Sequence, residues 1–368
     1  MKKLDEQTIV ITGASSGIGL ATARMAAAKG ARVVLSSRNE PELRRLVDEI
    51  RREGGQAIFV AADVGDEEAL RHVADAAIEA FGGIDTWVNN AGVSIYGGTL
   101  EVSIDDQRKL FETNFWGVVH GSRIAVGHLR RRGGTLINIG SVASERALPI
   151  QGIYSATKHA MKAWTDALRT ELEHEGAQVA VVLIEPASID TPYTEHARNY
   201  MDRDPQLPPP LYTPEVVARA ILANAQRPHA RVTVGGSAPG LTSLGRIAPR
   251  LGDKIMGSKA MYEGQRTEHQ AGRADALWGP PRSEGEVRGY NHRALHHSTY
   301  TWAEMNRGKV ALFAAAALGG LLAARTARSA RSSRSAPRAG RTAGSYRAAP
   351  ARERPTAAPA DLWRSTWH

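Results

Sequence analysis

The sequence contains no cysteine among its 368 residues. Disulfide bonds, thiolate zinc sites and thiol nucleophiles are therefore excluded. The chain begins MKKLDEQTIVITG, where Asp5 and Glu6 interrupt any apolar stretch, so we expect no secretory signal peptide. These features fit a cytoplasmic location, although cysteine-free proteins also occur in oxidising compartments.

Most of the chain carries almost no net charge. The formal net charge is +9, but residues 325–368 hold ten Arg, no Lys, one Glu and one Asp, which gives 10 − 2 = +8. The remainder therefore sums to 9 − 8 = +1. The basic tail has few aromatic residues and no recognised nucleic-acid module, so we expect no specific nucleic-acid partner.

Clusters of metal ligands are also missing. His292, His296 and His297 lie close together in the sequence, but no cluster of carboxylates accompanies them. Metal sites need several converging ligands, so we expect these histidines to be solvated and no metal to be bound.

Between residues 8 and 275, short apolar runs alternate with helical stretches such as 17–29, 40–53 and 67–81. The apolar runs show no polar alternation, which is typical of strands covered by helices on both faces. This order predicts an α/β fold with a doubly wound, mostly parallel, seven-stranded sheet. The expected strands are 8–12, 32–36, 57–61, 86–89, 134–140, 178–184 and 231–234.

Changes in composition divide the chain into parts. Residues 1–275 form the expected folded domain, and 276–307 mix Gly, Pro, His and charged residues without periodicity, as in a linker. Residues 308–324 are an apolar helical segment, and 325–368 are rich in Arg, Ala, Ser and Pro, which predicts a disordered tail. The proline-rich insertion 193–212 follows the sixth strand, where we expect a mobile substrate lid or, alternatively, a solvated loop.

The apolar run 310–324 has fifteen residues, which as a helix reach roughly 23 Å of the ~30 Å hydrocarbon core. Spanning would also export the Arg-rich tail, against the positive-inside tendency. We therefore expect 310–334 to lie at a cytoplasmic membrane surface. Spanning the membrane and packing against protein remain the alternatives.

A glycine-rich turn lies between the first expected strand and the first expected helix. Its sequence is Thr12-Gly13-Ala14-Ser15-Ser16-Gly17-Ile18-Gly19. Glycines permit positive φ and close approach to a pyrophosphate, and the helix N-terminus supplies free N–H groups. A purely structural tight turn is the alternative.

The Gly-x-x-x-Gly-x-Gly spacing resembles the short-chain dehydrogenase/reductase family, in its branch of compact single-domain enzymes. The resemblance covers about residues 5–240. Other motifs of the family follow in order: Asn89-Asn90-Ala91-Gly92, Asn114, Ser141 and Tyr154-x-x-x-Lys158. It implies a Rossmann fold and a hydride transfer between a nicotinamide cofactor and a carbonyl or alcohol. Homo-oligomers are common in the family.

The resemblance also implies which residues bind the cofactor. They lie at the carboxyl ends of successive strands: Gly13, Ser15, Ser16, Gly17, Ile18, Gly19, Ser37, Arg38, Asp63, Val64, Asn90, Ala91, Gly92, Tyr154, Lys158, Pro186, Ala187, Ile189 and Thr191. Asp63 is expected to bond the adenine, but it could also cap the third helix. Asn90 is expected near the cofactor ribose, whereas Asn89 is expected to tie strands together.

The end of the second strand indicates which cofactor is preferred. NAD-selective Rossmann enzymes place a carboxylate there to bind the ribose 2′-hydroxyl, but this chain has Ser37 followed by Arg38. An Arg can pair with a 2′-phosphate. We therefore predict NADP(H) over NAD(H), with Arg38 as a solvated helix-start residue the alternative.

Tyr154 and Lys158 are four residues apart on an expected helix, so they share one face. Tyrosine has a pKa of about 10, and a neighbouring ammonium lowers it. The resemblance makes Tyr154 the general acid/base, and Lys158 the residue that lowers its pKa and holds the nicotinamide ribose. It implies that Ser141 binds the substrate oxygen and that Asn114 supports a proton relay through water. Taken singly, a Tyr at a helix start and a Ser after a strand have ordinary packing and capping explanations.

The sequence departs from the family after the sixth strand. There the string is Pro186-Ala187-Ser188-Ile189-Asp190-Thr191, with Ala187 in place of a usual glycine. Ala fits only if φ is negative, or at a cost of roughly 1 kcal/mol. The resemblance implies nicotinamide contacts from Ile189 and Thr191.

The expected pocket segments are mostly apolar or aromatic, which predicts a lipophilic carbonyl or alcohol substrate. Substrate contacts are expected from Ser141, Val142 and Tyr193, within the candidate segments 142–152, Trp116 and 193–212. A non-catalytic NADP(H)-binding redox sensor is the alternative function. Such a sensor would not need Tyr154, Lys158, Ser141 and Asn114 together.

Overall fold

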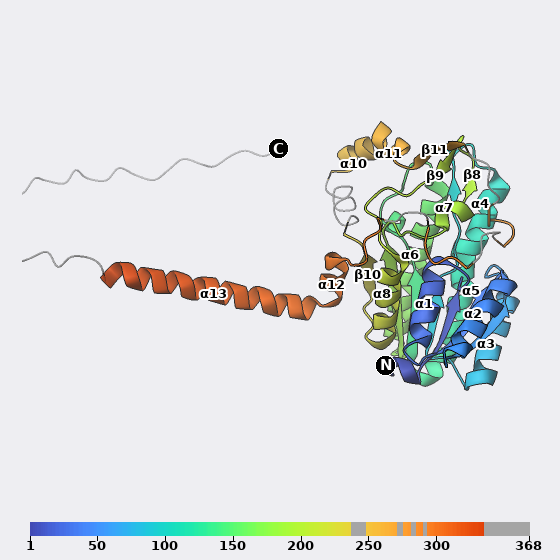
Figure 1. Ribbon diagram of the computed structural model, residues 1–368, viewed down its shortest axis with the longest axis horizontal. Helices are drawn as coiled ribbons and strands as arrows, with labels where there is room; N and C mark the ends of the chain where they lie inside the picture. Colours follow the sequence, from blue (N-terminus) through green and yellow to red (C-terminus); the bar gives the residue numbers. More distant parts are fainter. Residues whose placement is uncertain (237–247, 271–274, 281–284, 290–292, 335–368) are drawn as a thin grey trace, which may run out of the picture. The chain divides into compact units, whose positions relative to one another are not determined.

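The computed structural model describes residues 1–236, 248–270, 275–280, 285–289 and 293–334. Its centre is a parallel seven-stranded sheet in the order β10-β7-β6-β4-β1-β2-β3 (Figure 1). The strands are β1 (Thr8–Thr12), β2 (Arg32–Ser37), β3 (Gln56–Ala61), β4 (Thr86–Asn89), β6 (Gly134–Ile139), β7 (Val179–Pro186) and β10 (Arg231–Val234). The predicted fold class is confirmed, and each expected strand is present within two residues of its expected bounds.

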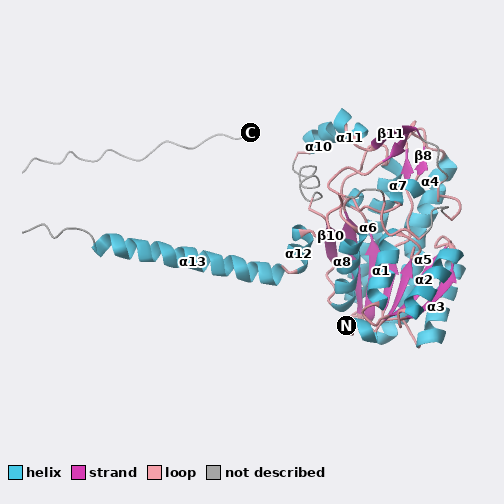
Figure 2. Cartoon of the chain, viewed as in Figure 1, coloured by secondary structure: helices cyan, strands magenta, loops and turns pink. Residues whose placement is uncertain are grey.

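Helices cover both faces of the sheet, as Figure 2 shows. One hydrophobic core joins the sheet to α1 (Gly17–Ala27), α2 (Glu40–Arg52) and α8 (Pro214–Gln226). The other joins it to α3 (Glu67–Phe81), α5 (Gly117–Arg132) and α6 (Gly152–His174). Burial on both sides explains why the strands read as continuous apolar runs.

Short irregular elements connect these layers near the carboxyl end of the sheet. They include α4 (Ile104–Phe111), a π-helical turn η2 (Glu112–Trp116) and a 3₁₀ turn η3 (Val142–Ser144). A further 3₁₀ turn, η1 (Leu4–Glu6), precedes β1. Turns η2 and η3 matter most here because they carry residues of the candidate site.

The expected lid contains regular structure. It holds α7 (Tyr193–His196), β8 (Arg198–Asn199), which pairs with β5 (Ile95–Tyr96), and β9 (Arg203–Pro205), which pairs antiparallel with β11 (Arg266–Gln270). The insertion is therefore tied to the body through two small sheets.

The chain beyond β10 continues to pack on the domain. Helices α10 (Pro249–Met256) and α11 (Lys259–Glu263) precede β11, and α12 (Thr299–Met305) lies beside β10. Within the segment expected as a linker, Ala276 and Leu277 are buried. One compact unit accordingly runs from Met1 to Val310.

Side chains of α12 occupy the outer edge of β10. The N–H of Thr233 donates to Glu304 Oε2 at 2.9 Å, and the N–H of Gly235 donates to Thr301 Oγ1 at 3.0 Å. These bonds satisfy backbone groups that an edge strand otherwise leaves open.

The final described element is α13 (Arg307–Arg334), most of which belongs to a second unit that begins at Ala311. The helix includes the first ten residues, 325–334, of the segment expected to be a disordered tail; 335–368 lie outside the described residues. Val310, Leu312 and Phe313 are exposed on it. Among the described residues, no helix is both long and apolar enough to cross a membrane.

Candidate active site

The glycine-rich turn links β1 to α1, and its glycines have no side chains to cover the backbone. Gly13 has φ +65°, in the left-handed region that glycine adopts without strain. A Cβ on Gly19 would lie 2.0 Å from the carbonyl oxygen of Gly13, so no side chain fits there. The turn therefore places no side chain of its own glycines between a pyrophosphate and the N-terminus of α1. The first N–H of that helix, from Gly17, donates to the carbonyl oxygen of Glu286 at 2.9 Å.

A cavity of about 410 Å³ opens beside this turn and reaches the predicted catalytic residues. Its lining includes every predicted cofactor and substrate residue except Gly19, which lies beneath the turn, and the predicted catalytic residue Asn114 is not part of it. The cavity thus brings together side chains from the carboxyl ends of β1, β2, β3, β4, β6 and β7, where open α/β sheets bind ligands.

Tyr154 lies in the first turn of α6, and Ser141 is the N-cap of η3 directly after β6. Burial raises the pKa of Tyr154, while hydrogen bonding with Ser141 and Tyr193 acts in the opposite direction. Burial is the largest of these effects on the pKa of Tyr154. Tyr154 is therefore protonated at neutral pH and can donate a proton.

Lys158 lies one turn further along α6. Its Nζ donates to the carbonyl oxygen of Ile139 at 3.0 Å and lies 5.8 Å from the centre of the Tyr154 ring. Burial lowers the pKa of Lys158 to about 8, because the charged form loses hydration. The ammonium is still mostly charged at neutral pH.

Asn114 lies in the π-helical turn η2 and is fully buried. Its Oδ1 accepts from the N–H of Val93 at 3.0 Å, and its Nδ2 donates to the carbonyl oxygen of Val93 at 2.9 Å and to Thr157 Oγ1 at 3.2 Å. These bonds hold the loop after β4 against α6. The expected water relay is a separate role that these contacts do not test.

The two asparagines at the end of β4 make different contacts. Asn89 Nδ2 donates to Asn138 Oδ1 of β6 at 2.9 Å, so it ties neighbouring strands as predicted. Asn90 Nδ2 donates to the carbonyl oxygens of Thr12 and Gly13, at 3.0 and 3.1 Å. Asn90 therefore braces the glycine-rich turn from inside the cavity.

Arg38 follows β2, next to the buried Ser37. Its guanidinium donates to the carbonyl oxygens of Ala276, at 2.5 Å, and Leu277, at 3.3 Å, and lies 3.9 Å from Asp63 Oδ2. Only 19% of the side chain is exposed. These two bonds use two of the five donors of a guanidinium, so the group retains donors for a phosphate.

Asp63 lies beside Arg38, just after β3. Burial would raise the pKa of Asp63, but the N–H of Gly65 and the Lys109 ammonium hold it below its usual value. The cap of α3 is Asp66, whose Oδ1 accepts from the second and third N–H groups of the helix. The alternative of Asp63 as this cap is therefore wrong.

The loop after β7 forms the opposite wall. Ala187 is not among the described residues with positive φ, so the replacement of the usual glycine causes no strain there. Thr191 approaches the glycine-rich turn so closely that a Cβ on Gly17 would lie 3.1 Å from it. Both residues line the cavity, together with Pro186 and Ile189.

Much of the cavity lining is apolar. It includes Val142, Leu148, Tyr193, Leu207, Pro208, Pro209 and Met261, and the Tyr193 ring packs edge-on against Tyr154 with 5.6 Å between ring centres. Met261 belongs to α11 and Ala276 to the chain beyond β11, and neither was predicted because no motif marks those segments. Trp116 does not line the cavity; it is 44% exposed on the π-helical turn, so its place in the expected pocket is wrong.

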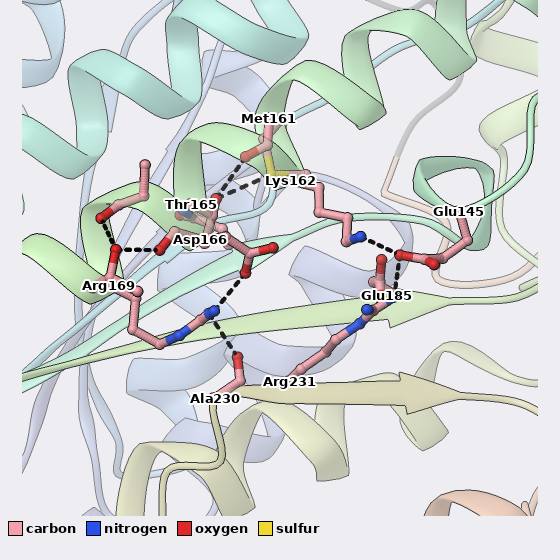
Figure 3. Close-up of polar contacts among 12 residues, drawn as sticks. Glu145, Met161, Lys162, Thr165, Asp166, Arg169, Glu185, Ala230 and Arg231 are labelled. Carbon is pink, nitrogen blue, oxygen red and sulfur yellow. Dashed lines mark hydrogen bonds and ion pairs between the residues drawn. The ribbon is translucent and has the colours of Figure 1, made fainter.

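A charged cluster that the sequence analysis missed joins the chain after η3 to α6, β7 and β10 (Figure 3). Glu145 accepts from Lys162 of α6 and from Arg231 of β10, and Arg231 also pairs with Glu185 of β7. Glu185 is 1% exposed, and burial raises its pKa to about 7 despite the Arg231 charge. The cluster ties α6 and the residues after η3 to the edge of the sheet, next to Gly140.

Comparison with known proteins agrees with this geometry. Residues 7–202 match the model of the short chain dehydrogenase family. The uncharacterized oxidoreductase YxnA of Bacillus subtilis is 50% identical over 271 residues, which cover 73% of this chain and 76% of that protein.

Two solved structures are also similar. A short chain dehydrogenase/reductase from Burkholderia phymatum in complex with NAD has a TM-score of 0.62 and 30% identity, and the match covers 68% of this chain and 96% of that one. An alcohol dehydrogenase from Thermococcus sibiricus complexed with 5-hydroxy-NADP has a TM-score of 0.55 and 26% identity, with 62% and 95% covered.

The fold and its cleft define a Rossmann-type oxidoreductase. The chain belongs to the short-chain dehydrogenase/reductase family, as the family match and the 50% identical relative show.

Proposed function

We propose that the chain is an NADP(H)-dependent reductase or dehydrogenase that acts on a lipophilic carbonyl or secondary alcohol. The observation that carries this proposal is the convergence of Tyr154, Ser141 and Lys158 in one cavity with the glycine-rich turn. A redox sensor would need the turn but not this arrangement.

The cofactor, when bound, supplies or accepts the hydride at its nicotinamide ring. The Tyr154 hydroxyl, protonated at neutral pH, donates its proton to the substrate oxygen during reduction and recovers it during oxidation. The Ser141 hydroxyl stabilises charge on the same oxygen. The Lys158 ammonium favours the phenolate once the proton has left, and Asn114 keeps the loop beside it in place.

The apolar lining of the cavity supports a lipophilic substrate. Leu148, Leu207 and Met261 present hydrocarbon surface in the cavity that also holds Tyr154 and Ser141, and apolar groups of a substrate gain roughly 25 cal/mol per Å² when they leave water. A few polar groups then orient the carbonyl, as is usual in small-molecule pockets.

Purified protein, NADPH and a panel of lipophilic ketones and aldehydes test this function. Tyr154→Phe should reduce turnover at least ~100-fold while NADPH affinity stays nearly unchanged. Tyr300→Phe is the matched control, because Tyr300 belongs to α12 and does not line the cavity. Equal turnover by the Tyr154 variant and wild type would refute the assignment.

Arg38 supports the preference for a 2′-phosphate. We expect Arg38→Asp to lower kcat/KM for NADPH relative to NADH by roughly 10–100-fold, as expected for loss of a charge-assisted bond. The ratio is the readout, because other contacts of Arg38 affect both cofactors. Arg44→Asp, an exposed charge reversal on α2, should leave the ratio unchanged.

We further propose that the protein works in the cytoplasm, where α13 and the Arg-rich tail contact an anionic membrane surface. The exposed Leu312 and Phe313 supply apolar contacts, and the +8 of residues 325–368 supplies the electrostatic attraction.

A further inference from the structure

The chain beyond β11 returns across the mouth of the cavity. In residues 275–280, the N–H of Ala276 donates to the carbonyl oxygen of His196 at 2.9 Å, and Ala276 itself lines the cavity. The carbonyl oxygens of Ala276 and Leu277 accept from Arg38. Leu277 is fully buried. This stretch therefore forms a wall at the end of the cleft that Arg38 marks.

The next described stretch, 285–289, lies over the glycine-rich turn. The carbonyl oxygen of Glu286 accepts from the N–H of Gly17, the first residue of α1, at 2.9 Å. A Cβ on Gly289 would lie 3.0 Å from the carbonyl oxygen of Thr191. This stretch therefore contacts both the turn and the loop after β7, which face each other across the cleft.

Side chains fasten both stretches to the body. The contacts are Asp275 Oδ2 with Arg198 at 2.8 Å, Trp278 Nε1 with Asp106 Oδ1 at 2.7 Å, and Arg288 with Glu215 Oε1 at 3.1 Å. The partners come from β8, α4 and α8. Three separate elements thus hold these residues in place, which distinguishes them from a loop that merely passes the opening.

We propose that residues 275–280 and 285–289, here called the strap, form an outer wall of the dinucleotide site and retain the bound cofactor. The proposal rests on the dinucleotide site proposed above, but not on its preference for a 2′-phosphate. At one end Ala276 lines the cavity beside Arg38, and at the other Glu286 is bonded to the Gly17 N–H at the glycine-rich turn. A dinucleotide that reaches from the turn to Arg38 is then released only when the strap lifts, so the strap sets the residence time of the cofactor.

Release of NADPH from the full-length chain tests the strap, measured by stopped-flow fluorescence after displacement with excess NADP⁺. The double variant Asp275→Ala/Trp278→Ala removes two fastenings. We expect its dissociation rate constant to rise at least tenfold and its Kd to increase. The matched control is Asp202→Ala/Trp302→Ala. It removes a carboxylate that pairs with Arg203 and Arg266, together with an exposed tryptophan, and both positions lie outside the strap. Its dissociation rate constant and Kd should match those of wild type.

The possible outcomes distinguish a failure of the strap from a failure of the dinucleotide site. An unchanged dissociation rate would overturn the strap alone. Tighter binding through a faster association rate would also overturn it, because the strap would then compete with the cofactor rather than enclose it. Running NADH in parallel separates the strap from the 2′-phosphate preference, because loosening the strap should accelerate release of either cofactor. Failure of wild type to bind either dinucleotide would overturn the site and the strap together.

A second measurement covers the case in which the double variant misfolds. The chain has no cysteine, so Leu277→Cys introduces a single thiol at a fully buried position of the strap. We expect saturating NADPH to slow its reaction with a thiol reagent at least tenfold. Gly127→Cys, at an exposed position of α5 with open space around it, should react at the same rate with and without cofactor. Equal protection of both thiols, or of neither, would overturn the strap.

Discussion

At the scale of single residues, burial of the Lys158 ammonium lowers the free energy of unfolding. Its pKa falls from 10.5 to about 8 on burial, and a shift of this size corresponds to about 3 kcal/mol against the folded state. The penalty is complete below pH 8, where both folded and unfolded chains are protonated. It decreases between pH 8 and 10.5, where only the unfolded chain remains charged.

We therefore expect Lys158→Met to abolish turnover and yet to raise the free energy of unfolding at pH 7 by about 2–3 kcal/mol. The gain should disappear as the pH approaches 10.5, which denaturant unfolding at several pH values would show. Lys162→Met, the same change one turn further along α6, should destabilise the fold because it leaves Glu145 without one of its partners. A loss of stability in the Lys158 variant at pH 7 would contradict this account.

Residue-scale predictions could be made where the members of a motif lie close together in the sequence. The glycine-rich turn, Ser141 and the Tyr154–Lys158 pair are local patterns, and the structure places them around one cavity as the parallel topology requires. The cluster of Glu145, Lys162, Glu185 and Arg231 left no such signal, because its members come from four separate segments and each alone reads as an ordinary surface charge.

At the scale of elements, strands of four to eight residues were readable because burial on both faces makes them apolar throughout. The two-residue strands β5 and β8 are too short to show any periodicity. Residues 276–307 were predicted to be a linker because their composition is mostly polar, although a few residues such as Leu277 are buried. Their contacts with Arg38 are made by backbone carbonyl groups, which the pattern of side chains cannot indicate.

The helix α13 allows a prediction about the membrane. A chain that ends at Val310 keeps the first compact unit intact, so its Tm should stay within about 2 °C of the full-length value, a shift below ~1 kcal/mol. It should lose co-sedimentation with vesicles that contain anionic lipid. Full-length chain bound to vesicles in low salt should be released by high salt, because screening weakens the attraction.

The full-length variant Arg325→Gln/Arg328→Gln/Arg331→Gln/Arg334→Gln separates charge from apolar contact. It keeps Leu312 and Phe313 and should bind anionic vesicles weakly. Equal sedimentation of the truncated and full-length chains would remove the basis for a membrane contact through this helix.

At the scale of the whole molecule, the fold follows from the alternation of apolar strands and helices, which can be recognised in the sequence. The order of the seven strands obeys the doubly wound scheme, and the cleft lies at the carboxyl edge where that scheme places it. What the alternation could not predict is how far the domain continues. The periodicity fades after β10, yet packing persists through α12, because short segments can be held by a few specific contacts without repeating ones.

The covering of β10 by α12 has a consequence for how the chain is made. Thr233 and Gly235 leave the ribosome well before Thr301 and Glu304, the residues that later occupy their N–H groups. During that interval the nascent sheet has an open edge onto which a strand of another chain can add. A protein interrupted before α12 is therefore at risk of edge-to-edge aggregation even though its catalytic motifs are complete. Once α12 is in place, finished copies can no longer associate by adding a strand at β10.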